Sequence, residues 1–218
     1  MSEKSPKKFV NNSNNLNSGI RIQKALSKIG VGSRREIERA IVEKRISVNN
    51  KKAELGQSVS DSDRIVFDGK LIKLNSKKNI ARILIYNKPI GEIVSESDPK
   101  GRATVFDHLP QIKNAKWISI GRLDFNTSGL LIFTSYGEFA NRLMHPRYEI
   151  EREYSVRVLG ELNENQISQL TSGIKLEDGL AKFESIKFKG GEGSNHWYQV
   201  ILKEGRNREV RRLFEFFN

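Results

Sequence analysis

A polar segment at residues 75–79 divides the chain into two parts with different residue patterns, and this division constrains the fold more than any other feature. Before it, apolar residues recur at spacings of three and four, which is typical of helices. After it, short apolar runs bounded by polar or glycine-containing segments are typical of strands. At about 150 residues per domain, a chain of 218 residues has room for one small module and one larger domain.

The first part carries most of the positive charge. Residues 1–75 contain 16 Lys or Arg against 8 Asp or Glu, whereas residues 76–218 contain 22 against 18. The whole chain has a net charge of +12. An excess of this size favours an anionic partner such as nucleic acid. Charge alone leaves a second reading open, in which the basic groups only solvate the surface.

The composition excludes several kinds of chemistry. The absence of cysteine rules out disulfides, thiol catalysis and cysteine-ligated zinc, and it is compatible with a reducing compartment. The three histidines are scattered, so we expect no metal site. No apolar run approaches the roughly 20 residues that cross a membrane. We therefore expect a cytoplasmic protein with no membrane partner and no small-molecule cofactor.

Residues 19–76 are predicted to form the small module, with two short helices followed by small strands. Residues 1–18 are almost entirely polar and are predicted to be a disordered tail. Ser33 with Glu36 three positions later has the spacing of a capping box at the start of the second helix. We expect that helix to continue as far as Arg45.

Two segments of this module, Ser33-Arg34-Arg35 and residues 45–49, resemble the S-four RNA-binding domain, which is named after a small-subunit ribosomal protein. The resemblance implies that the loop and the start of the second helix meet RNA phosphates. The implied contacts are Arg34, Arg35, Lys44 and Arg45. Phosphates are attracted to arginine side chains and to helix N-termini, which agrees with this role. A solvated charged helix face is the alternative.

Residues 80–218 are predicted to form a larger α+β domain dominated by antiparallel strands. Strands are predicted at residues 82–87, 117–120, 130–134, 154–159, 180–188 and 197–203, and helices at residues 137–144, 163–171 and 207–217. Ser135 and Glu138 again have the spacing of a capping box. Regular alternation of strands and helices, which would indicate a parallel sheet, is not seen.

The segment at residues 117–136 is the most informative. Two apolar, strand-like runs flank a polar loop that contains Gly121, Arg122, Asp124 and Thr127. An aspartate in such a loop either faces a cleft or satisfies the backbone of its own turn. Spacing alone favours the turn.

Sequence motifs favour the cleft. Gly-Arg-Leu-Asp at residues 121–124, followed by Thr-Ser-Gly-Leu-Leu at residues 127–131, resembles the signature of the pseudouridine synthases. Residues 87–91 resemble the family's first motif, residues 151–156 the strand with its active-site tyrosine, and residues 204–213 its last motif. Four motifs in the family's order make the resemblance specific. It implies a mainly antiparallel pseudouridine synthase domain behind the S-four-like module.

The resemblance also implies a reaction and a site. Pseudouridine synthases detach uracil from ribose, turn the base and rejoin it through carbon-5, with no cofactor. The implied catalytic residues are Asp124, as nucleophile or base, Arg211, which would pair with it, and Tyr154, which would stack on the base. The implied substrate-binding residues are Arg122, Leu213 as an apolar wall, and Lys88 in the first motif.

Residues 190–198 and 141–146 are similar to the branch of the family that modifies 23S ribosomal RNA of the large subunit. We expect this RNA, free or within an assembling subunit, to be the partner of a monomeric enzyme. Two alternatives stay open. One is a synthase acting on 16S RNA of the small subunit, and the other is an inactive RNA-binding factor in ribosome assembly.

The chain departs from the family pattern in two places. Glu92 follows Gly91 where the family usually has an apolar residue, and we expect this to be a small surface difference. Relatives continue past the last predicted helix with another strand and a basic tail. We therefore expect the catalytic domain to be truncated at Asn218.

Overall fold

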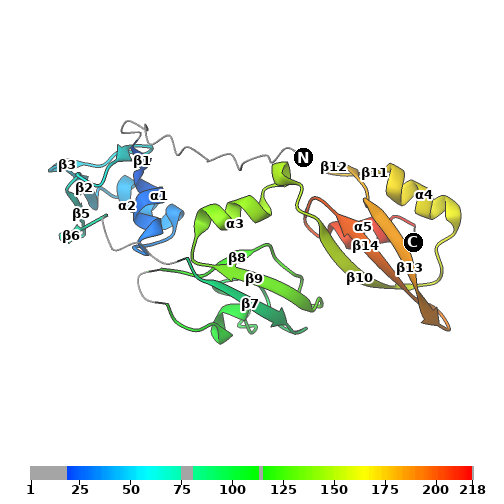
Figure 1. The fold of residues 1–218 in the computed structure, drawn as a ribbon. Helices are drawn as coiled ribbons and strands as arrows, with labels where there is room; N and C mark the ends of the chain where they lie inside the picture. Colours follow the sequence, from blue (N-terminus) through cyan, green and yellow to red (C-terminus); the bar gives the residue numbers. More distant parts are fainter. Residues whose placement is uncertain (1–18, 75–80, 113–114, 218) are drawn as a thin grey trace, which may run out of the picture. The chain divides into compact units, whose positions relative to one another are not determined.

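The computed structural model describes residues 19–74, 81–112 and 115–217, which group into two compact units (Figure 1). The first unit ends before Ala81 and also takes in Ile112 and Lys116; the second contains the rest. The predicted tail at 1–18 and linker at 75–79 lie outside the described residues. So do the expected domain limits at 76 and 80, which stay predictions. Within the described ranges, no helix is long and apolar enough to cross a membrane.

The first unit packs two helices against small antiparallel sheets. Its elements are β1 (Ile20–Arg21), α1 (Ile22–Lys28), α2 (Arg34–Val42), β2 (Ile46–Val48), β3 (Lys51–Lys52), β4 (Ser58–Val59), β5 (Ile65–Phe67) and β6 (Lys70–Ile72). One sheet has the order β3-β2-β5-β6, and β1 pairs with β4. Apolar residues of both helices form one buried core with Ile46 and Ile65 from the sheet. The unit is therefore held by a single core.

The predicted capping box of α2 is confirmed. Ser33 Oγ accepts a hydrogen bond from Glu36 N at 3.2 Å, and Ser33 N donates to Glu36 Oε2 at 2.6 Å. The predicted extension of the helix to Arg45 is wrong, because α2 ends at Val42. Lys44 has a left-handed φ of 58°, which turns the chain into β2. Lys44 and Arg45 thus lie in the connection after the helix.

The second unit contains two three-stranded antiparallel sheets and a hairpin, which confirms the α+β class. The strands are β7 (Ile83–Lys88), β8 (Ile118–Ile120), β9 (Gly129–Thr134), β10 (Arg152–Leu159), β11 (Ile174–Leu176), β12 (Gly179–Ala181), β13 (Ser185–Glu192) and β14 (Asn195–Leu202). The sheet orders are β7-β9-β8 and β10-β14-β13, and β11 pairs with β12. The α-helices are α3 (Gly137–Met144), α4 (Glu164–Ser172) and α5 (Glu209–Glu215), with 3-10 turns η1 (Val105–His108) and η2 (Pro146–Tyr148).

Two local predictions for this unit are wrong. The strand expected at 180–188 is interrupted, since Phe183 is fully buried and its N–H donates to Leu170 O of α4 at 2.9 Å. The capping box expected at the start of α3 does not form. Ser135 Oγ instead accepts from Arg82 N at 3.0 Å, and Tyr136 occupies the N-cap position. In both cases a tertiary contact replaces the local pattern.

Two apolar clusters support the second unit. Under β7 and β9, Phe133 is fully buried and meets Phe106 edge-to-face, with ring centroids 5.4 Å apart. Under β14, Tyr198 and Val200 pack with α4 and with Leu213 of α5. The first cluster supports the loop between β8 and β9, and the second supports α5. These two elements carry Asp124 and Arg211, and β10 carries Tyr154, the third residue predicted for catalysis.

Replacing Ser33 with alanine should destabilise the start of α2 by about 1 kcal/mol, because the side-chain acceptor for Glu36 N is lost. Backbone amides of α2 should then exchange with solvent about fivefold faster by hydrogen exchange. Ser33→Asp keeps an acceptor at the cap and should behave as wild type. Unchanged exchange in Ser33→Ala would contradict a stabilising role for the cap.

Candidate active site

The loop at residues 121–128 joins β8 to β9 and is closed by backbone hydrogen bonds. Thr127 N donates to Asp124 O at 3.0 Å, which forms a tight turn, and Gly91 N donates to Phe125 O at 2.9 Å. Gly121 enters the loop with φ of 83°, a conformation that glycine adopts without steric cost. The predicted polar loop is therefore present, and its backbone is anchored to the segment that follows β7.

A buried lysine anchors the same loop from below. Lys88, at the end of β7, has no exposed surface, and its Nζ donates to Pro89 O at 2.8 Å, Thr127 O at 2.8 Å and Asp124 O at 3.1 Å. Burial lowers the pKa of Lys88, and the nearby carboxylates of Glu92 and Asp124 oppose that shift. The three acceptors match the three N–H donors of an ammonium group. Lys88 was predicted to bind substrate; the structure places it inside the protein, where it holds the loop that contains Asp124.

Glu92 is not the surface residue that the sequence predicted. It is 8% exposed, Tyr86 OH donates to its Oε2 at 2.8 Å, and His108 Nε2 lies 3.3 Å from its Oε1. Burial and the bond to this carboxylate raise the pKa of Tyr86 to about 12. A buried carboxylate is tolerated when it is hydrogen-bonded and close to a cation. Here its electrostatic partner is the Lys88 ammonium, so Glu92 belongs to the support of the loop.

Asp124 and Arg211 lie together although 87 positions separate them in sequence. Arg211 Nε is 3.3 Å from Asp124 Oδ2, and Arg211 Nη2 donates to Thr127 Oγ1 at 3.3 Å. Each of the two charged side chains is 39% exposed, so the pair is open to a ligand. The guanidinium neutralises the carboxylate and bridges two positions of the loop. The structure thus forms the expected pair, while its catalytic role stays a prediction.

A second aspartate fixes the helix that carries Arg211. Asp178, in the turn between β11 and β12, accepts two hydrogen bonds from Arg212, both at 2.8 Å, and one from Arg206 at 3.2 Å. Arg206 also reaches buried Glu209 in the first turn of α5 at 3.1 Å. The hairpin is thereby connected to α5 in two ways, directly through Arg212 and indirectly through Arg206 and Glu209. Sequence reasoning missed Asp178, since its partners lie 28 and 34 positions away and only the fold brings them together.

Tyr154 and Leu213 belong to one apolar cluster, which also contains residues of β14 and α4. Tyr154, on β10, is half-buried, and burial raises the pKa of its hydroxyl, which is therefore protonated at neutral pH. Leu213, on α5, is fully buried. Among the described residues, no hydrogen bond joins Tyr154 to Asp124 or Arg211. The predicted stacking of Tyr154 on a base and the predicted wall at Leu213 stay predictions.

The predicted RNA contacts fall into two groups. Arg34, Arg35 and Arg122 are exposed, and none forms an ion pair with another described residue. Arg45 differs, because its Nε donates to Asp68 Oδ1 at 2.8 Å and its Nη1 to Glu43 Oε2 at 3.0 Å. Both partners raise the pKa of Arg45. A phosphate at Arg45 would have to compete with two carboxylates.

Lys44 is exposed in the same connection, and its backbone carbonyl accepts a hydrogen bond from Lys52 Nζ at 2.8 Å. The Lys44 ammonium has no partner among the described residues. It is therefore available to an anion, unlike the guanidinium of Arg45.

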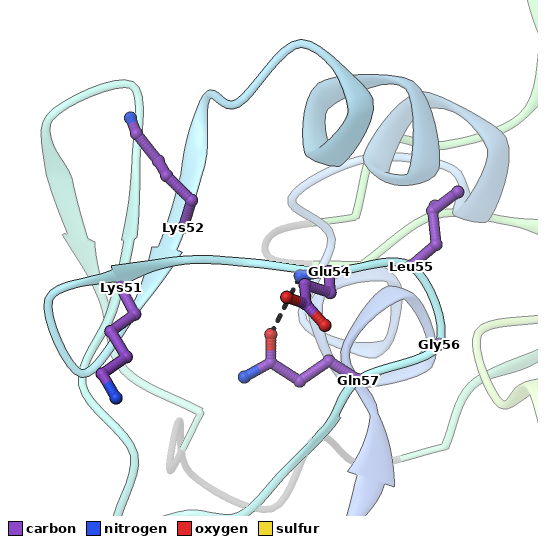
Figure 2. Close-up of a pocket in the computed structure, with 6 residues that line it drawn as sticks. All are labelled: Lys51, Lys52, Glu54, Leu55, Gly56 and Gln57. Carbon is purple, nitrogen blue, oxygen red and sulfur yellow. Dashed lines mark hydrogen bonds between the residues drawn. The ribbon is translucent and has the colours of Figure 1, made fainter.

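A hollow in the first unit coincides with none of the predicted residues. Figure 2 shows its lining, which consists of Lys51, Lys52, Glu54, Leu55, Gly56 and Gln57. Glu54 N donates to the Gln57 side-chain oxygen at 3.1 Å, and Arg21 reaches Gly56 O at 2.9 Å. These contacts close the turn locally. The hollow therefore has a structural explanation that requires no ligand.

The family model described as RNA pseudouridylate synthase matches residues 82–216, and the S4 domain matches residues 20–65. The first match covers more than half of the chain and includes the Asp124 loop and α5. The chain therefore belongs to the RNA pseudouridylate synthase family and carries an S4 domain before the synthase domain.

Several proteins that are more than 50% identical to this chain share the name "Ribosomal large subunit pseudouridine synthase B". The protein of Pseudomonas aeruginosa is 54% identical over 199 residues, covering 90% of this chain and 52% of that protein. The protein of Yersinia pestis is 53% identical, covering 90% and 63%, and that of Haemophilus influenzae is 55% identical, covering 90% and 56%. This chain thus spans between half and two thirds of the length of these relatives.

A solved structure described as "Crystal structure of pseudouridylate synthase" has the same fold. It superposes with a TM-score of 0.59 over 91% of this chain and 83% of its own, at 23% sequence identity. At that identity the likeness bears on the fold alone, and it confirms the predicted fold class.

Replacing Lys88 with methionine should lower the free energy of unfolding by roughly 1–3 kcal/mol, because three carbonyl groups lose their buried donor. The measurement is equilibrium denaturation by urea. Lys100→Met, which removes an exposed ammonium in the same unit, is the control and should leave stability unchanged. Equal stability of the two variants would show that Lys88 does not hold the loop.

The Asp178 pairs should make stability depend on pH in acid. Arg212 lowers the pKa of Asp178, so the pairs stabilise the folded state above the unfolded pKa of about 4. This contribution is lost as the pH falls through the lower folded pKa. The wild-type Tm should therefore fall more steeply between about pH 4 and pH 2 than that of Asp178→Asn. Other acidic groups titrate in both proteins, and Asp61→Asn, which breaks no described ion pair, should keep the wild-type slope.

Proposed function

We propose that this chain isomerises uridine to pseudouridine in the 23S RNA of the large ribosomal subunit, with Asp124 as its catalytic carboxylate. The observation that carries the proposal is the Asp124–Arg211 pair, formed between the family's signature loop and its last motif at 3.3 Å. The relatives' names support the large-subunit substrate.

The reaction needs no net change in atoms or electrons. The bond between C1′ of ribose and N1 of uracil breaks, the base turns, and a bond forms between C1′ and C5. The proton on C5 leaves, and N1 gains one. A carboxylate serves this sequence either as a nucleophile toward the sugar or as a base that removes a sugar proton. Asp124 is suited to both roles, because it lies beside a permanent cation and remains partly exposed.

Arg211 is the charged partner that orients the carboxylate of Asp124. A guanidinium group is planar and permanently charged, and that of Arg211 reaches Asp124 and Thr127 at once. Arg211 thereby orients Asp124 as well as neutralising it. The grip of Asp178 on α5 supplies the rigidity that such orientation needs.

The target uridine has to leave its helix or loop to reach Asp124, as in other enzymes that act on a base. In this proposal Tyr154 stacks on the extruded base, Leu213 supports that surface, and Arg122 meets the RNA beside the loop. Lys88 is excluded from substrate contact, because it is buried and its three donors are used.

The first unit supplies additional affinity for RNA in the proposal. Arg34 and Arg35 stand at the N-terminus of α2, where backbone N–H groups and guanidinium groups both attract phosphate. Lys44 is exposed in the connection after α2. We assign Arg45 a structural role, because Asp68 and Glu43 already neutralise it. The enzyme would act as a monomer in the cytoplasm, on free RNA or on an assembling subunit.

The test is to map pseudouridines in 23S and 16S RNA from cells with and without the gene, and then from cells that carry Asp124→Asn. One 23S site should disappear without the gene and stay unmodified in the variant, with activity on a transcript reduced more than 100-fold. Asp61→Asn, an exposed aspartate of the first unit, is the matched control and should restore the site. Loss of a 16S site instead would show that the substrate is the 16S RNA of the small subunit.

Loss of no site would overturn the enzyme assignment in favour of a binding factor. Normal modification by Asp124→Asn, with the site absent in cells that lack the gene, would instead overturn the assignment of Asp124 alone.

A further inference from the structure

Two arginines of the second unit share one tyrosine ring at the end of α3. The Arg142 guanidinium carbon lies 6.0 Å from the centre of the Tyr148 ring, and that of Arg147 lies 4.5 Å from it. Arg147 also donates to the Tyr148 hydroxyl. Both arginines are exposed, and Tyr148 is half-buried. We call Arg142, His145, Arg147 and Tyr148 the α3–η2 cluster.

Two features occur together in this cluster: both arginines lie against one ring, and neither has a carboxylate partner among the described residues. Arg102, Arg206, Arg208 and Arg212 each pair with a carboxylate of the same unit. Among the described residues, neither Arg142 nor Arg147 does so. Two like charges held against one ring repel each other, and only the ring's weak attraction offsets this. An anion placed between or beside them would relieve the repulsion.

Histidine adds a third donor. His145 packs edge-to-face against Tyr148, with ring centroids 6.3 Å apart, and its Nδ1 accepts a hydrogen bond from Arg147 N at 3.3 Å. With Nδ1 acting as acceptor, the neutral ring carries its proton on Nε2. The exposed ring thus offers an N–H donor beside two guanidinium groups.

The cluster is held in place relative to the strand that carries Tyr154. Arg152, two positions before Tyr154 on β10, donates to Leu143 O of α3 at 3.0 Å and to Ile150 O at 2.9 Å. The end of α3 is thereby fastened to the start of β10. In sequence the cluster lies between the Asp124 loop and Tyr154, so the chain runs through it from one part of the proposed active site to the other.

We propose that the α3–η2 cluster binds the phosphate backbone of the RNA substrate, close to the extruded uridine. This inference rests on the proposed function for the identity of the RNA. Its chemistry is specific: guanidinium groups form paired hydrogen bonds with phosphate oxygens, and an aromatic ring that orders two of them reduces the conformational entropy lost on binding. The contact is to the backbone and is independent of base identity.

The test measures binding of the full chain to a protein-free 23S RNA transcript over a range of salt concentrations. Each arginine that contacts a phosphate contributes about 1 to the slope of log K against log salt. The Arg142→Ala/Arg147→Ala variant should therefore lower that slope by 1 to 2. Lys182→Ala removes an ammonium that already lies 3.6 Å from Glu184 Oε1, and its slope should be close to wild type. A slope in the double variant no lower than in Lys182→Ala would overturn the proposal.

Steady-state kinetics separates this inference from the proposed function. Because a backbone contact is made in the ground state and the transition state alike, the double variant should raise KM and leave kcat nearly unchanged. A lowered kcat with unchanged KM would overturn the binding role. If no pseudouridine depends on the gene but the salt slope still falls, the proposed function fails and the RNA-binding cluster stands.

Discussion

The buried ammonium of Lys88 is the interaction on which the rest of the site depends. It lies where β7 ends and donates to two backbone carbonyls within the loop at residues 121–128, those of Asp124 and Thr127, and to that of Pro89. An ammonium without exposed surface is costly unless all its donors are used and an opposite charge is near. Three carbonyl oxygens use the donors, and Glu92 supplies the charge. The loop is thus shaped by a group with no exposed surface.

Arg211 reaches this loop from the far end of the chain, and its approach requires a rigid helix. α5 is short, so its own hydrogen bonds do not hold it in place. Burial of Leu213 in the core and the grip of Asp178 on Arg212 and Arg206 do so instead. Arg211 and Arg212 are adjacent in sequence but form different contacts. One pairs with Asp124 in the proposed active site, and the other ties the helix to the β11–β12 hairpin.

Much of this was predictable from the sequence, because the relevant signals are local. The Ser33 cap and the polar loop between two apolar runs both depend on residues within a few positions of each other. Predictions failed where a distant contact competed with the local pattern. Ser135 has the spacing of a helix cap, but its hydroxyl accepts a hydrogen bond from the backbone N–H of Arg82, the residue before β7. Glu92 was expected at the surface, but in the fold Tyr86 donates a hydrogen bond to its carboxylate and His108 lies beside it.

By itself, the sequence determined the class of fold, the family and the identity of the acidic residue in the signature loop, since short motifs in a fixed order carry that information. Only the tertiary structure decided how each charge is used. Lys88 and Arg45 were both expected to contact RNA, yet one is buried under the loop and the other is bound to Asp68. Conversely, the sequence assigned no role to Arg142 and Arg147. In the structure they lie against one tyrosine ring, and neither has a carboxylate partner among the described residues. A charge acts on what lies within a few ångströms of it, and the fold sets those neighbours.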